Sequence, residues 1–257
     1  MDPADAGHFT TFQVRGGRAQ GLGLHLDRLA AASRELYGSV PGRRAVLSAI
    51  GTALAAAGPA ASDCTLRVRV HPPRAGYRGH HLPPGRPGPA LRVEADVQAP
   101  RHPPASPIRV RAHAGLRERP GVKHLALDFQ REARRAARAA GFDDALLLAA
   151  DGRISEGTFW NIVLLDDGGW VWPDAPALPG ITMALLRSQL RRAAAPQREA
   201  LVDLSAVAGM QAAFALNSTG IVEIAAIDGH ELRGDAQAGA SLRELLAAVA
   251  WDSCRAA

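Results

Sequence analysis

The chain has 257 residues, of which 47% are hydrophobic and 21% charged, and its formal net charge is +5. This composition is typical of a folded globular protein and excludes an intrinsically disordered chain. The length allows one large or two small domains. We expect no membrane-spanning segment, because no apolar run approaches the ~20 residues that cross a bilayer, and no signal peptide, because residues 1–8 lack a basic and apolar stretch.

The spacing of the cysteines and the distribution of charge indicate which kinds of site and partner to expect. Cys64 and Cys254 lie far apart, without the spacing of a metal site or a redox motif, so we expect no metal and a reducing, cytoplasmic location. The arginines are interleaved with acidic residues and only 5% of residues are aromatic, which argues against a nucleic-acid partner.

The first half of the chain mixes strands and helices. Alternation and helical periodicity predict, in chain order, a strand at 9–14, helices at 24–36 and 42–57, a strand at 66–70, a loop rich in Pro and Gly at 71–90, and strands at 91–97 and 108–112. His80-His81 in that loop has no acid or cysteine at ligand spacing and is interpreted as part of the loop.

The composition of the chain changes after Pro120, where the second half begins. It is predicted to contain helices at 124–140, 181–194 and 241–250, and strands at 145–150, 161–165, 213–216 and 222–227. Trp170 and Trp172 alternate along a further strand, where we expect them to pack in the core. The predicted boundary divides a small N-terminal α+β domain, 1–114, from a larger C-terminal domain, 115–257.

The 30 basic residues of the chain include a single lysine, Lys123. Arginine can replace lysine wherever only a positive charge is needed. It cannot replace a lysine whose deprotonated amine attacks a carbonyl, because the guanidinium keeps its proton in a protein. The only lysine in an arginine-rich chain is therefore a candidate Schiff-base nucleophile, although the chance survival of a surface lysine is the alternative.

Four segments, the second of which contains this candidate, follow one another in a characteristic order. They are His25-Leu26-Asp27-Arg28-Leu29; Lys123 at the start of a predicted helix; Ser155-Glu156-Gly157 with Asn161, followed by Leu178-Pro179-Gly180-Ile181-Thr182; and Asn217-Ser218-Thr219-Gly220 with Asp228-Gly229. Each segment alone is a weak signal. The ordered set resembles the class IV enzymes that depend on pyridoxal phosphate, which include branched-chain and D-amino acid aminotransferases and aminodeoxychorismate lyase.

The resemblance implies an α+β fold like that of D-amino acid aminotransferase. A small N-terminal α/β sandwich domain would precede a larger, β-barrel-like domain with surrounding helices, and the enzyme would be a homodimer. Lys123 would form the aldimine with the cofactor and then move the substrate α-proton. Glu156 matches the acid that binds the pyridine nitrogen and keeps the ring protonated.

The resemblance also assigns the cofactor phosphate to five residues. Arg28 supplies a guanidinium whose fork suits a phosphate, while Ile181 and Thr182 open a helix whose N–H groups and dipole favour an anion. Asn217 and Ser218 occupy the second phosphate-binding position. Without the resemblance, these residues are equally compatible with a solvated helix arginine, a helix cap and a turn between strands.

The chain departs from the family in two places. Its start lacks about 25 residues that usually precede the first strand, and Phe9-Thr10 stands where an aromatic–acidic pair is expected. Substrate-binding basic residues of the family often lie in the loop that here contains Arg74 and Arg78, and the sequence does not choose between them or decide that either binds a carboxylate.

Three functions remain open from the sequence. The first is an aminotransferase that acts on a small amino acid and 2-oxo acid pair. The second is a lyase that releases pyruvate, which Asn217-Ser218 favours to some degree. The third is a non-catalytic relative, although a binding protein would need neither Lys123 nor Glu156.

Overall fold

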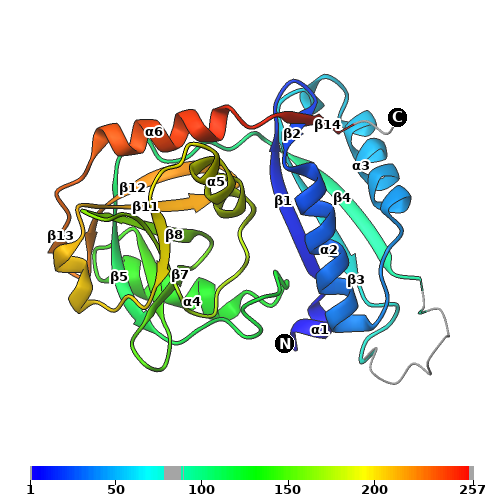
Figure 1. The fold of residues 1–257 in the computed structure, drawn as a ribbon. Helices are drawn as coiled ribbons and strands as arrows, with labels where there is room; N and C mark the ends of the chain where they lie inside the picture. The colour runs from blue at the N-terminus through cyan, green and yellow to red at the C-terminus, as the bar shows by residue number, and fades with distance from the viewer. Residues whose placement is uncertain (1, 78–87, 89, 255–257) are drawn as a thin grey trace. The chain divides into compact units, whose positions relative to one another are not determined.

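The computed structural model describes residues 2–77, 88 and 90–254, so Arg78 and His80-His81 lie outside the described residues. The chain forms two compact units. Unit 1 comprises Met1–Arg101, Val122–Ala126 and Ala250–Ala257, and unit 2 comprises His102–Gly121 and Leu127–Val249. The chain therefore returns to unit 1 twice after it has entered unit 2, once at Lys123 and once at its end (Figure 1).

Unit 1 is built on a three-stranded antiparallel sheet with the order β1-β3-β4. A two-stranded ladder joins β2 to β14, so that the end of the chain pairs with residues near its start. The elements of unit 1 are α1 (Pro3–Ala6), β1 (His8–Val14), β2 (Arg18–Gln20), α2 (Leu22–Tyr37), α3 (Arg43–Ala57), η1 (Gly58–Ala61), β3 (Cys64–His71), β4 (Arg92–Gln98) and β14 (Trp251–Ser253).

Helix α2 covers β1 because its buried residues recur at helical spacing. Leu22, Leu26 and Leu29 on α2 pack in one core with Phe12 and Val14 of β1. The helix ends at Tyr37 and is followed by the cap residue Gly38, whose φ of 64° is in the left-handed region that glycine adopts without strain. The buried face of β1 is not wholly apolar, because His8 and Thr10 also lie on it.

Unit 2 contains a nine-stranded mixed sheet. Its main path has the order β10-β9-β8-β11-β12-β5-β6-β7, and β13 pairs with β12. The elements of unit 2 are β5 (Ile108–Ala114), α4 (Asp128–Ala139), β6 (Asp144–Leu148), β7 (Ile154–Gly157), β8 (Asn161–Asp166), β9 (Gly169–Pro173), α5 (Ile181–Arg192), β10 (Gln197–Ala200), η3 (Ser205–Gly209), β11 (Ala212–Asn217), β12 (Gly220–Ile227), β13 (His230–Glu231) and α6 (Ala236–Ala247).

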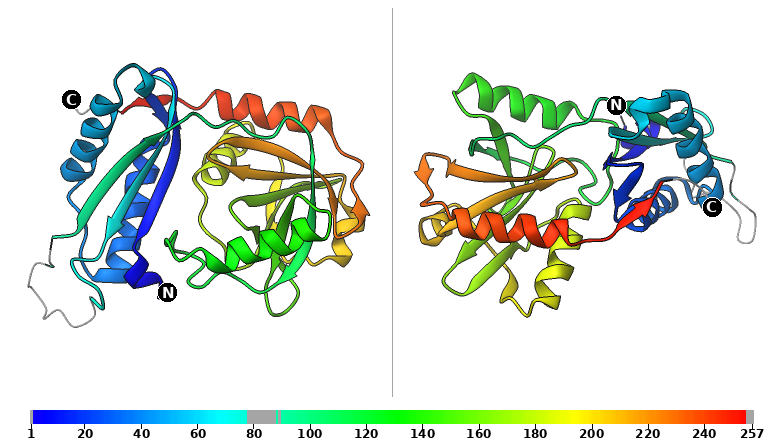
Figure 2. Two further views of the ribbon diagram at one scale, coloured as in Figure 1. Left: turned by 180° about the vertical axis from the view of Figure 1, so that it is seen from behind. Right: turned by 90° about the horizontal axis from the view of Figure 1, so that it is seen from above.

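Both faces of this sheet are buried, so its strands are nearly continuous apolar runs. Along β8, Ile162 and Leu164 enter one core, and Val163 enters another together with Trp170 and Trp172, which confirms the expected packing role of the two tryptophans. Helices α5 and α6 cover the second core, while α4 packs against β6. Figure 2 shows α4 and α6 on opposite sides of the strands.

A buried carboxylate joins three elements of unit 2. Asp144, at the start of β6, accepts hydrogen bonds from the Thr158 hydroxyl at 2.6 Å and from the Trp160 indole N–H at 2.9 Å. Arg134 of α4 donates to both oxygens of the same carboxylate, at 3.1 and 2.5 Å. The turn between β7 and β8 is therefore fixed to the helix on the other side of β6.

The structure differs from the expected elements at two helices. The helix expected from His124 begins only at Asp128, because residues 122–126 pair with β1 instead. The helix expected at 241–250 begins at Ala236, where the Asp235 side chain accepts from the Ala238 N–H at 2.8 Å. It ends at Ala247, and the chain then forms β14. In both cases the competing structure is a strand contact with a part of the chain remote in sequence.

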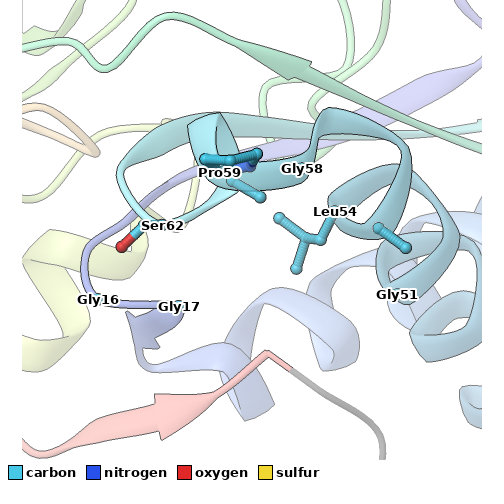
Figure 3. Close-up of a pocket in the computed structure, with 9 residues that line it drawn as sticks. Gly16, Gly17, Gly51, Leu54, Gly58, Pro59 and Ser62 are labelled. Carbon is cyan, nitrogen blue, oxygen red and sulfur yellow. The ribbon is translucent and has the colours of Figure 1, made fainter.

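Helix α3 is unusual in its exposure. Among the described residues, the stretch Arg43–Ala61 is long and apolar enough to cross a membrane by length and composition alone, and most of it is exposed. The apolar content of this stretch is mostly alanine, and one such helix does not overturn the expectation of no membrane-spanning segment. A hollow of about 590 Å³ lies beside this stretch and is lined by glycines, alanines, Leu54, Pro59 and Ser62, without an ionisable side chain. Figure 3 shows these lining residues.

Burial of His8 predicts that the stability of the protein depends on pH. Burial, together with His71 and Arg28, lowers the pKa of His8 from 6.5 to about 3. Between these two pH values His8 is protonated in the unfolded chain and neutral in the folded chain. The free energy of unfolding therefore falls as the pH falls from about 6.5 towards 3, by about 1.4 kcal/mol per pH unit for this group. Denaturant titrations of His8→Asn should show a shallower loss than those of the wild type.

The control is His230→Asn, because the His230 side chain is exposed. This variant should keep the wild-type slope. An equal slope in wild type and His8→Asn would contradict the buried, neutral histidine.

Candidate functional site

Lys123 lies in a short segment that is bound to β1 through its backbone. The Phe9 N–H donates to the Lys123 carbonyl at 2.9 Å and the Leu125 N–H donates to the Gly7 carbonyl at 2.8 Å. His8 and His124 form an antiparallel bridge between these two bonds. Lys123 is half-buried, and its Nζ lies 5.1 Å from the centroid of the Phe9 ring. The lysine is therefore held at an edge of the unit 1 sheet and does not open a helix.

Arg28 lies on α2, one turn after His25, and both side chains meet β1 at one residue. Arg28 Nη2 donates to the Thr10 hydroxyl at 2.6 Å, and His25 Nδ1 lies 2.6 Å from the same oxygen. Thr10 is fully buried and His25 is 3% exposed. Burial first, then the positive charges of Arg28 and Lys123, lower the pKa of His25 well below its ordinary value, so this histidine is neutral at pH 7.

Glu156 lies on β7, all four residues of which are buried. Its Oε2 accepts a hydrogen bond from the Leu178 N–H at 3.2 Å, and its Oε1 is 3.8 Å from Nη1 of Arg117. Both side chains of this ion pair are at most 5% exposed. Burial lowers the pKa of Arg117, and the neighbouring Glu156 opposes that change. A negative charge on Glu156 is thus stabilised by one cation and one backbone N–H.

Leu178 connects the Glu156 strand to the helix that follows. Its carbonyl accepts from Asn161 Nδ2 at 2.8 Å, while its N–H is bound to Glu156. Asn161 also fills the space beside Gly180, where a Cβ atom would lie 1.8 Å from Asn161 Oδ1. Only glycine therefore fits at the residue that precedes α5, and the two halves of the third sequence segment are fixed to each other.

The start of α5 contacts the end of β11. Ile181 is the first residue of α5, and the Thr182 hydroxyl donates to the Asn217 carbonyl at 2.8 Å. The Asn217 side-chain oxygen accepts from the N–H and from the hydroxyl of Thr219, at 2.8 and 2.6 Å, which closes the turn before β12. Ser218 lies in this turn and is half-buried. Four of the predicted phosphate-binding residues therefore belong to one helix start and one adjoining turn.

The predicted site residues divide between the two units. Lys123 and Arg28 belong to unit 1, and Glu156, Ile181, Thr182, Asn217 and Ser218 belong to unit 2. Arg74, a candidate for the substrate carboxylate, is exposed. None of these residues lines the hollow beside α3 or a second one of about 380 Å³ between β5 and α4. The described residues contain no group of three or more His, Cys, Asp or Glu that could hold a metal ion.

Sequence reasoning missed Arg117 and the roles of Thr10 and His25. Arg117 lies in the run Leu116-Arg117-Glu118-Arg119-Pro120, and nothing in this run distinguishes it from the other arginines. Its partner is 39 residues away in sequence, on a strand that only the tertiary fold brings near it. His25 was visible as the first residue of the His-x-Asp-Arg-Leu segment, but its contact with Thr10 was not.

Comparison with known proteins identifies the family. The family model described as amino-transferase class IV matches residues 7–227. No curated protein matches the chain. A solved structure of a putative 4-amino-4-deoxychorismate lyase from Legionella pneumophila has a TM-score of 0.79 at 20% identity and covers 95% of this chain and 91% of its own.

Two further solved structures are similar. A hypothetical aminotransferase from Mycobacterium tuberculosis in its pyridoxal-phosphate-bound form has a TM-score of 0.79 at 20% identity and covers 96% of this chain and 89% of its own. The branched-chain amino acid aminotransferase of Escherichia coli has a TM-score of 0.80 at 14% identity and covers 98% and 91%. These identities show the fold alone, and they confirm the predicted α+β class.

The Arg117–Glu156 pair generates a stability prediction. Arg117→Met removes the cation beside a buried carboxylate, and we expect the free energy of unfolding to fall by about 3–5 kcal/mol. The matched control is Arg109→Met, which breaks the exposed pair with Glu231 at 2.8 Å and should cost less than about 1 kcal/mol. Urea titrations of both variants measure the difference. Equal losses of unfolding free energy in the two variants would show that the buried pair contributes no more to stability than the exposed pair.

Proposed function

Because the chain belongs to the class IV aminotransferase family, whose cofactor is pyridoxal phosphate, we propose that it is an aminotransferase acting on a small amino acid and 2-oxo acid pair through Lys123. The observation that supports this most directly is the position of Lys123. It is the single lysine of the chain, and its carbonyl accepts a hydrogen bond from the Phe9 N–H of β1.

The described residues fit the cofactor chemically. Its phosphate needs cations and N–H donors, which Arg28, the first turn of α5 and the turn at Asn217-Ser218 supply. A protonated pyridine nitrogen needs a negative acceptor, which Glu156 supplies. Gly180 makes room for the Asn161 side chain, which holds the Leu178 carbonyl just before the start of α5. No side chain of the set has the wrong charge for its assigned role.

Each proposed site residue has a separate role in the reaction. When bound, pyridoxal phosphate supplies an electron-withdrawing ring that delocalises the electrons left by a broken substrate Cα–H bond. The Lys123 amine, when neutral, accepts the proton from the substrate Cα and returns it at the next step. Arg117 and the Leu178 N–H stabilise the negative charge of Glu156, and the ionised carboxylate would keep the pyridine nitrogen protonated. Arg28 and the N–H groups of the first turn of α5, at Ile181 and Thr182, would bind the phosphate. The Thr182 hydroxyl itself already donates to the Asn217 carbonyl.

A second candidate function is a lyase that releases pyruvate. It is favoured by the Asn217-Ser218 pair, and one similar structure is named as a putative 4-amino-4-deoxychorismate lyase. The Asn217 side-chain oxygen is engaged in closing its own turn, so the Asn217 amide nitrogen and Ser218 are the groups of the pair that would bind a ligand. Both activities would use Lys123 and Glu156 in the same way.

The proposed setting is a homodimer in the cytoplasm. The dimer rests on the resemblance to the family. The location is supported by the two cysteines, which are both free and buried. Burial raises the pKa of Cys254 to about 11, so its thiol is unreactive at pH 7. Sedimentation of the purified enzyme would test the dimer, and a stable, active monomer would exclude it.

Substitution of Lys123 tests the proposed nucleophile. Lys123→Ala and Lys123→Arg should both lose turnover, because neither provides a neutral amine. After borohydride treatment of the wild type with one equivalent of pyridoxal phosphate, peptide mapping should find the pyridoxyl group on Lys123. Arg131→Lys is the control, since it adds a second, exposed lysine that should stay unlabelled. Wild-type activity in Lys123→Arg would falsify the assignment.

Two substrate tests separate the aminotransferase from the lyase. With an amino donor alone, an aminotransferase should convert the bound cofactor to pyridoxamine phosphate in a single turnover, which absorbance measures. A lyase should instead release pyruvate from aminodeoxychorismate with no amino acceptor present. We expect the first result, and pyruvate release without cofactor conversion would assign the lyase activity.

A further inference from the structure

We propose that Thr10 is a positioning residue that holds Arg28 in place for the cofactor phosphate through a hydrogen-bond chain from Arg28 to Thr10 to His25. This inference rests on the proposed function, because it assigns the phosphate to Arg28. It concerns the one position in the first strand at which the chain carries a hydroxyl where the family resemblance predicts an acid.

The chemistry of the three groups fixes the direction of the chain. A guanidinium can only donate, so the Thr10 oxygen accepts from Arg28 Nη2 at 2.6 Å. The hydroxyl proton of Thr10 then needs an acceptor, because Thr10 is fully buried. The His25 Nδ1 atom, 2.6 Å away, is that acceptor. Thr10 therefore donates to His25, and the neutral imidazole carries its proton on Nε2.

The environment of His25 agrees with this assignment. Nδ1 can accept only if His25 is neutral at this nitrogen, and the lowered pKa of His25 keeps it neutral at pH 7. The ring is also held by Phe12, with 4.8 Å between the ring centroids. His25 is thus a fixed acceptor, and it in turn fixes the rotamer of the Thr10 hydroxyl.

An acid at this position could not make the same chain. An ionised carboxylate accepts hydrogen bonds but has no proton to donate, so it would require His25 to present an N–H at Nδ1. Threonine does both, because it accepts from Arg28 and donates to His25. The consequence for function is a guanidinium oriented before the phosphate arrives, which reduces the side-chain entropy lost on binding.

The test compares pyridoxine 5′-phosphate with pyridoxine. Neither compound has an aldehyde, so neither can attach to Lys123, and the ratio of their affinities measures the phosphate contribution alone. In Thr10→Val we expect this ratio to fall about tenfold, the loss expected for a hydrogen bond to a charged group. Thr10→Ser keeps the hydroxyl and should restore the ratio to near the wild-type value.

The matched control is Thr11→Val, the same change one residue along β1. The Thr11 hydroxyl is buried but makes no hydrogen bond to the described residues, so its loss should leave the ratio unchanged. An equal loss of affinity for both compounds in Thr10→Val would show a merely structural role and overturn the proposal. So would an unchanged ratio, or the same fall in Thr11→Val.

A second measurement separates this proposal from the proposed function. In ¹⁵N NMR spectra of the cofactor-free protein, His25 should be neutral with its proton on Nε2, and the Nδ1 shift should change in Thr10→Val but not in Thr11→Val. A wild type that binds the phosphate compound no better than pyridoxine would count against the proposed function and the phosphate role of Arg28. A proton on Nδ1 of His25 would overturn the Thr10 chain itself.

Discussion

The buried carboxylate of Asp144 is the contact on which the architecture of unit 2 depends. Five donated hydrogen bonds meet there, from Arg134 twice, from Thr158, from Trp160 and from the N–H of Ala145. The segment between Glu156 and Asn161 is consequently fixed at two of its residues. The Trp160 ring lies so close to Gly157 that a Cβ there would come within 1.9 Å of it. A charge buried in this way is stable because its donors surround it.

The candidate site of unit 2 is built outwards from that fixed segment. Glu156 precedes it and Asn161 follows it, and the two side chains hold the N–H and the carbonyl of Leu178. Since Leu178 lies two residues before Gly180, the start of α5 is placed by the same pair of side chains. The acid that would bind the cofactor ring and the helix that would bind its phosphate are therefore parts of one hydrogen-bonded structure, which is the preorganisation that binding of a rigid cofactor requires.

Unit 1 contains buried polar groups that are neutral and lie near Arg28. His8 of β1 and His25 of α2 are buried, and burial and nearby positive charges lower the pKa of each. His8 Nε2 meets Ser33 Oγ at 2.8 Å, and His25 meets Thr10 at 2.6 Å. Keeping these histidines uncharged avoids further positive charge beside Arg28 and Lys123. These buried groups of unit 1 therefore form hydrogen bonds without adding charge.

The sequence by itself determined the element types, the family and the residues with distinctive chemistry. Periodicity located α2, α5 and the apolar strands of unit 2, and the single lysine, the Ser-Glu-Gly run and the Leu-Pro-Gly run are local features that need no partner to be recognised. Only the tertiary structure decided that residues 122–126 join β1, that β14 pairs with β2, and that Arg117 and Thr10 support Glu156 and Arg28. The physical reason is that these contacts join residues at least 18 positions apart, and an arginine or a threonine carries no local mark of the distant group that it will meet.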